Sequence, residues 1–144
     1  MLPCLSNAVL IGDKRKYLAC LLTFKVKTEK EVCKEAGLQG DEETGDTPTN
    51  NLSSEAIEWC ISVGSNATTV NEILETRDPN VFGAIQIGID KANKHAVSRA
   101  STIQKWDILP LDLSVPTGEL GPTLKLKRFA FNKKYENNIN KLYA

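Results

Sequence analysis

Five basic residues and no acidic residue lie in the segment 124–134, LKLKRFAFNKK. This segment follows a turn-forming stretch that contains Gly118, Gly121 and Pro122, so it should begin at the end of a loop and continue into a helix. A lysine in such a place is a movable point charge, because its long stem carries three rotatable donors that suit a phosphate or a carboxylate. The residues alone also allow a solvated helix start, a contact with an anionic membrane surface or a contact with RNA.

The cysteines and the histidine do not form a pattern typical of catalysis or of zinc binding. No two of the four cysteines form a CxxC pair, since they lie at Cys4, Cys20, Cys33 and Cys60. The sequence therefore offers no local pair of zinc ligands, and we expect four reduced thiols. The one histidine, His95, falls on the polar side of an expected helix. Nucleophilic catalysis needs a base beside the nucleophile, so Ser-His-Asp and Cys-His chemistry are not expected.

Length and charge place the chain among ordinary single domains. It has 144 residues, and 18 Lys and Arg balance 18 Asp and Glu. A single domain over 1–144 is expected from this length, and the zero net charge argues against a dedicated nucleic-acid binder. No apolar run approaches the ~20 residues of a membrane span. Residues 1–10 lack the basic start of a signal peptide, which favours a cytoplasmic location.

The hydrophobic pattern predicts a small α+β fold, with a three-stranded sheet and flanking helices. The strands are expected at 7–11, 17–26 and 103–109, with a short addition near 112–115. The first two should form a hairpin with a charged tip, and the second should be central because both of its faces are apolar.

Helices are expected at 53–63, 70–76, 79–97 and 129–142, from apolar residues at helical spacing. Ser53 and Thr68 or Thr69 are N-cap candidates, and Pro79 suits a first turn. The segment 28–50 is rich in acids, glycine and polar residues. It is predicted to be an exposed acidic insert, with a short helix followed by a loop.

The order of these parts resembles a known family. The hairpin NAVLIGDKRKYLACLLTFK, a helical middle, IQKWDIL and GELGPTLKLKR follow one another between Asn7 and Tyr143. This arrangement resembles the small C-terminal lid domain of adenylate-forming enzymes, and within them the bubblegum group of long-chain fatty-acyl-CoA synthetases.

The resemblance assigns roles to the basic segment. Thr123-Leu124-Lys125-Leu126-Lys127-Arg128 matches the Thr-x-Lys-x-Lys-Arg pattern of long-chain synthetases. It implies that Lys125 is the catalytic lysine, bridging the fatty-acid carboxylate and the α-phosphate of ATP. Thr123, Lys127 and Arg128 are then expected near the nucleotide or as anchors of the loop, and Gly121 as a source of loop flexibility close to it.

The resemblance also implies cosubstrates and a partner. They are ATP with Mg²⁺, CoA, a long-chain fatty acid and a large N-terminal domain, whose glycine-rich phosphate loop these residues lack. The charged turn 12–16 is either an ordinary solvated turn or a surface that faces CoA after the lid rotates. Without the large domain, we expect no acyl-CoA formation. Peripheral contact with the endoplasmic reticulum membrane fits the same resemblance.

Two other hypotheses stay open. The chain could be a stand-alone binding module whose basic loop contacts a partner protein or an anionic membrane, or a lid of an adenylate-forming enzyme with another substrate.

Overall fold

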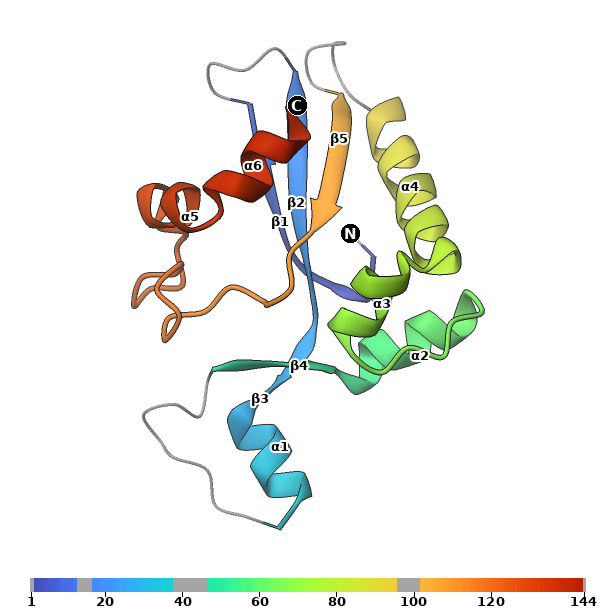
Figure 1. Cartoon of the computed structure of the whole chain (residues 1–144), viewed down its shortest axis with the longest axis vertical. Helices are drawn as coiled ribbons and strands as arrows, with labels where there is room; N and C mark the ends of the chain where they lie inside the picture. The colour runs from blue at the N-terminus through green and yellow to red at the C-terminus, as the bar shows by residue number, and fades with distance from the viewer. Residues whose placement is uncertain (1, 13–16, 38–46, 96–101, 144) are drawn as a thin grey trace.

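A computed structural model describes residues 2–12, 17–37, 47–95 and 102–143. A three-stranded sheet stands at its centre (Figure 1), made of β1 (Leu5–Ile11), β2 (Leu18–Phe24) and β5 (Ile103–Ile108) in the order β1-β2-β5. β1 and β2 pair antiparallel, and β2 and β5 pair parallel. The predicted α+β class, the hairpin and the central place of the second strand are confirmed.

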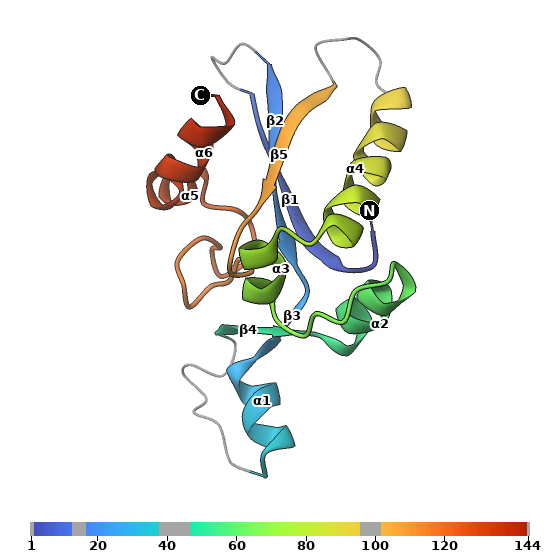
Figure 2. The same cartoon turned by 45° about the vertical axis from the view of Figure 1, so that its right-hand side comes forward.

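Helices cover both faces of this sheet, as the two views in Figures 1 and 2 show. On one face lie α2 (Ser54–Ser62), α3 (Val70–Thr76) and α4 (Pro79–Lys94). On the other lie α5 (Arg128–Lys134) and α6 (Glu136–Leu142). A parallel pair needs a long crossover connection, and α2, α3 and α4 lie within the connection from β2 to β5.

Successive side chains of β2 pack alternately into two separate hydrophobic cores. Cys20, Leu22 and Phe24 join the cluster beneath α2, α3 and α4. Ala19 and Leu21 join the cluster beneath α5 and α6. Side chains of a strand alternate between its faces, so the uninterrupted apolar run of β2 is explained by burial on both sides.

β1 contains an irregularity, so the residues before it and after it contribute side chains to different cores. Leu5 belongs to the first cluster and Val9 to the second, although their spacing would put both on one face of a regular strand. The register against β2 shifts between Leu5 and Asn7. Such a bulge changes the face that the following residues present.

The helix starts predicted from the sequence are confirmed by their caps. Ser53 and Thr69 accept hydrogen bonds from backbone N–H groups in the first turns of α2 and α3. Asp78 caps α4, and Pro79 is its first residue. His95 follows α4 and is exposed. The predicted helical residues 96 and 97 lie outside the described part of the chain.

The second predicted strand, 17–26, is three residues longer than β2, and the acidic segment after it is more ordered than expected. β2 ends at Phe24, because the N–H of Lys25 donates to Cys4 and its carbonyl accepts from Ser53. β3 (Val26–Thr28) and β4 (Pro48–Leu52) then form a second, two-stranded sheet. The expected short helix is α1 (Glu29–Glu35), which begins with a capping box at Thr28. Residues 38–46 lie outside the described part.

Two other expectations are wrong. Residues 112–115 form no strand, because the carbonyls of Ser114 and Val115 accept hydrogen bonds from Leu120 and Gly118 in the turn that follows. The single helix expected at 129–142 is divided at Tyr135, whose φ of −107° and ψ of 24° leave helical geometry. The predicted apolar stripe nevertheless continues across this break, with Phe131, Tyr135, Ile139 and Leu142 all buried.

Three of the four cysteines are buried and all four are free thiols, as predicted. Burial raises the pKa of Cys4 to about 12, and those of Cys20 and Cys60 to about 11. These thiols are therefore neutral at physiological pH and act as small apolar residues of the core.

Candidate functional site

The basic segment begins in a small hairpin-like turn, residues 119–127, which we call the lysine turn. The carbonyl of Glu119 accepts from the N–H of Lys127 at 2.7 Å, and Leu120 forms a bridge with Leu126. One step further along, the N–H of Gly121 donates to the carbonyl of Lys125 at 2.8 Å. Lys125 is thus held by backbone hydrogen bonds at the narrow end of the turn.

The tip of the lysine turn contains an unusual backbone conformation. Leu124 has a φ of 63° and its N–H donates to the carbonyl of Gly121 at 2.8 Å. A left-handed conformation costs a residue with a side chain about 1–2 kcal/mol. Such local strain is concentrated at functional sites, where the surrounding structure must impose it. Here it falls on the residue immediately before Lys125.

The ammonium group of Lys125 is exposed to solvent. Within the described part of the chain it makes no hydrogen bond and no ion pair. Thr123 and Lys127 are also exposed, on either side of it. The turn therefore presents a cation that no acid of the described ranges neutralises, and it can approach an anion carried by another molecule or domain.

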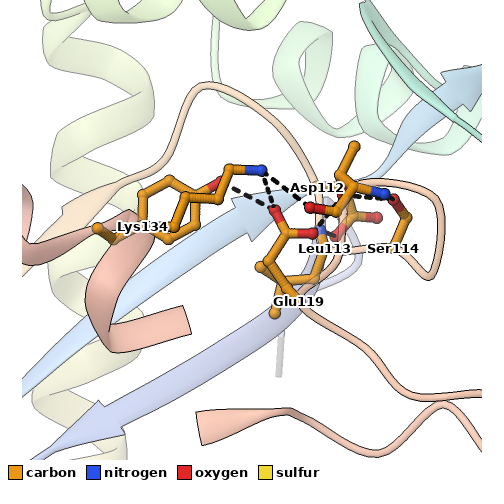
Figure 3. A network of polar contacts seen from close by, with 7 residues as sticks. Asp112, Leu113, Ser114, Glu119 and Lys134 are labelled. Carbon is orange, nitrogen blue, oxygen red and sulfur yellow. Dashed lines mark hydrogen bonds and ion pairs between the residues drawn. The ribbon is translucent and has the colours of Figure 1, made fainter. Parts of the chain in front are cut away.

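The base of the lysine turn is closed by a buried carboxylate (Figure 3). The side chain of Glu119 is 1% exposed and accepts from Lys134 Nζ at 2.7 Å. The hydroxyl groups of Thr117 and Tyr135 also donate to it, Tyr135 at 3.3 Å. The carboxylate is thus satisfied by one cation and two hydroxyl groups.

Opposing effects set the charge state of this carboxylate. Burial acts to raise the pKa of Glu119, but the hydrogen bonds from Lys134 and Thr117 outweigh it, and the pKa is lowered. Glu119 is therefore ionised at neutral pH. Burial, and then the negative charge of Glu119, raise the pKa of Tyr135, which stays a neutral phenol and a donor.

A second polar group attaches the same base to the central sheet. The carboxylate of Asp112 accepts from Asn7 on β1 and from Thr23 on β2, both at 2.9 Å. Two residues later, the carbonyl of Ser114 accepts from the N–H of Leu120 at 3.2 Å. Figure 3 shows Asp112 and Ser114 beside Glu119. Hydrogen bonds at Asp112 and at Ser114, joined by the short stretch of chain between them, therefore connect the sheet to the lysine turn.

A groove of about 770 Å³ lies next to the lysine turn, between the hairpin β1–β2 and the helices α5 and α6. Arg128 lines it and donates from Nη1 to the carbonyl of Leu10 at 2.9 Å. Phe129 stands at the groove and is 84% exposed. Arg128 thus fastens the start of α5 to β1.

Residues 13–16, part of the charged turn considered as a CoA-facing surface, lie outside the described residues. Gly121 is buried and its N–H is used within the lysine turn. The described residues contain no cluster of three His, Cys, Asp or Glu that could hold a metal ion, and none of their helices is long and apolar enough to cross a membrane.

Known relatives of the chain are fatty-acid–CoA ligases. The long-chain-fatty-acid–CoA ligase ACSBG2 of Gallus gallus is 46% identical over 142 residues, which are 99% of this chain and 17% of the relative. The ACSBG1 ligase of Homo sapiens is 46% identical over 142 residues, or 99% of this chain and 18% of the relative. The chain is homologous to a segment of these ligases.

The homology has a clear extent. The chain spans about a fifth of the length of these long-chain-fatty-acid–CoA ligases, since for ACSBG2 of Rattus norvegicus, at 45% identity, the share is 20%. The resemblance to this group of synthetases is therefore confirmed. No protein-family model and no solved structure matches the chain significantly.

The sequence alone did not reveal the residues that support the lysine turn. Glu119 and Lys134 are 15 positions apart, and neither spacing nor periodicity joins them. The one available signal was a single acid, Glu119, inside a glycine-rich turn that precedes five bases and no acid. Asp112 lay in the segment that was expected to be a strand, and its hydrogen bonds to Asn7 and Thr23 were not anticipated.

Proposed function

We propose that this chain is the C-terminal lid domain of a long-chain fatty-acid–CoA ligase, and that Lys125 supplies the cation for acyl-adenylate formation. The observation that carries the proposal is Lys125, which is exposed and has no ion-pair partner among the described residues, at the end of a turn held by backbone hydrogen bonds. The homology supports it, because a segment of about a fifth of a ligase has the size of one small domain.

The chemistry needs a cation at this position. A carboxylate oxygen of the fatty acid attacks the α-phosphorus of ATP, and pyrophosphate leaves with the electrons of the broken P–O bond. Two anions must approach each other and negative charge grows on the leaving group, so an ammonium group near both lowers the barrier. The long stem of Lys125 lets the charge reach beyond the turn into a neighbouring cleft.

Mg²⁺ would enter with ATP, whose phosphate oxygens bind it. When bound with ATP, it would neutralise part of the phosphate charge. The large domain, ATP, CoA and the fatty acid are therefore partners and substrates of the proposal. Rotation of the lid would then remove Lys125 and admit CoA, which displaces AMP and forms the thioester.

An exchange of segments tests this function. The matching segment of human ACSBG1 would be replaced by this chain, to which it is 46% identical. We expect the hybrid ligase to form long-chain acyl-CoA, and to lose this activity when the segment is deleted. A series of carboxylic acids of other sizes would reveal a different substrate class. A soluble, folded hybrid without activity toward any acid would contradict the lid function.

A specific observation keeps the binding-module hypothesis as a second candidate. Leu124 and Phe129 are 71% and 84% exposed and alternate with the exposed cations Lys125, Lys127 and Arg128. Apolar residues among cations are typical of a surface that contacts anionic membranes. The chain should then sediment with phosphatidylserine vesicles at low salt, and less so at high salt. Absence of sedimentation at low salt would refute this candidate.

A further inference from the structure

The ion pair between Glu119 and Lys134 joins the two sides of the lysine turn. Glu119 is the first residue of the lysine turn, and Lys134 is the last residue of α5, which follows the turn. Their contact of 2.7 Å closes a ring of chain that contains Lys125. A cross-link of this kind limits the conformations of the segment that it encloses.

Two backbone hydrogen bonds fix the position of Lys125 relative to Glu119. The carbonyl of Glu119 holds the N–H of Lys127, and the next contact joins Gly121 to the carbonyl of Lys125. On its other side, Glu119 is connected through Thr117 to Ser114, whose hydroxyl lies 2.6 Å from that of Thr117. The carboxylate is therefore the point where the turn, α5 and the preceding segment meet.

Packing alone would not require a charged pair at positions 119 and 134. Glu119 is fully buried, whereas the side chain of Lys134 is 41% exposed. An apolar residue at position 119 would avoid the cost of burying a carboxylate, since buried ion pairs are weak contributors to stability. What the ion pair adds is a directional contact that an apolar pair lacks.

We propose that Glu119 and Lys134 are positioning residues for Lys125, and that their ion pair keeps the lysine turn in the geometry needed for adenylation. This inference rests on the proposed function of Lys125. Neither residue touches the reacting atoms. They act by holding the turn, so their loss should slow the step that uses Lys125. The thioester-forming step, in which Lys125 is withdrawn, should continue.

The test uses the hybrid ligase described above and measures its two half-reactions separately. Adenylation is followed as fatty-acid-dependent pyrophosphate release, and thioester formation is followed from supplied acyl-adenylate and CoA. The variants are Glu119→Gln, which keeps the shape and loses the charge, Lys134→Met, and the conservative Lys134→Arg. Lys27→Met is the matched control, because Lys27 forms a remote ion pair with Glu35 at 3.0 Å.

We expect Glu119→Gln and Lys134→Met to lower kcat of adenylation about tenfold or more, since small displacements of a catalytic group are costly. KM for the fatty acid and the thioester step should change by less than about threefold. Lys134→Arg, which keeps a charged donor, should retain most of the activity. If Glu119→Gln does not fold, Lys134→Met carries the test, because Lys134 is partly exposed.

Lys125→Ala, measured beside these variants, separates the inference from the proposed function. If Lys125→Ala abolishes adenylation while Glu119→Gln and Lys134→Met behave like Lys27→Met, the positioning role is overturned and the proposed function stands. Equal losses in both half-reactions would also overturn it, since they indicate general damage to the fold. If Lys125→Ala leaves adenylation intact, the proposed function itself fails.

Discussion

Replacing Lys134 by methionine should destabilise the isolated chain, because it leaves the carboxylate of Glu119 buried without a counter-charge. Removing one partner of a fully buried ion pair typically costs about 3–5 kcal/mol. The side chain of Lys134 is 41% exposed, so water already screens part of this interaction. Thr117 and Tyr135 would still donate to the carboxylate. We therefore expect the free energy of unfolding to fall by about 2 kcal/mol at pH 7.

The loss should depend on pH in a defined direction. The pKa of Glu119 is lowered from its ordinary value of 4.5 in the folded chain, although burial alone would raise it. A lowered pKa contributes stability above the unfolded value, and this contribution disappears as the pH falls through the folded value. Without Lys134 the pKa of Glu119 should rise. The difference between the parent and Lys134→Met should therefore be largest near neutral pH and shrink below pH 4.5.

Urea unfolding measures this directly, with the fluorescence of Trp59 and Trp106 and far-UV circular dichroism as probes. Lys27→Met removes the cation of an ion pair whose acid, Glu35, is 59% exposed. Exposed pairs contribute about 0–1 kcal/mol, so this control should hardly change stability. A Lys134→Met variant that is as stable as Lys27→Met at pH 7, or a difference independent of pH, would refute the reasoning.

Two other predictions concern the cores. Phe131→Ala should cost about 3–5 kcal/mol, because Phe131 is fully buried, whereas Phe129→Ala in the same helix should cost almost nothing, because Phe129 is 84% exposed. Equal costs in urea unfolding would contradict the assignment of the buried face of α5. In the native chain, a thiol-specific reagent should label Cys33 first. The other three cysteines, Cys4, Cys20 and Cys60, are buried, and their thiol pKa values are raised. Peptide mapping that finds a buried cysteine labelled as fast as Cys33 would contradict this.

Local signals predicted the helices and the central strand well. Ser53, Thr69 and Pro79 fix helix starts through contacts within a few residues, so their effect can be read from the sequence. The apolar run of β2 predicted a central strand for a similar reason, since burial on both faces leaves no room for polar residues.

Long-range contacts explain most of what the sequence did not reveal. The end of β2 at Phe24 depends on Cys4 and Ser53, which bind the two sides of Lys25 from distant parts of the chain. Glu119 and Lys134 likewise meet only because the lysine turn folds back on α5. Lys125 could be singled out because its neighbours form a local pattern. The groups that hold its turn are assembled by tertiary structure and carry no such pattern.

The central claim is that the charge of Lys125 acts in adenylation. Its most direct test is the rate of fatty-acid-dependent pyrophosphate release by the hybrid ligase carrying Lys125→Ala, compared with Lys133→Ala, which removes an exposed cation from the same basic segment. Loss of one stabilising donor at a developing charge typically costs about 3 kcal/mol, or a hundredfold or more in rate. We predict such a loss for Lys125→Ala and a nearly unchanged rate for Lys133→Ala. Equal rates for the two variants would contradict a role of the Lys125 charge in adenylation.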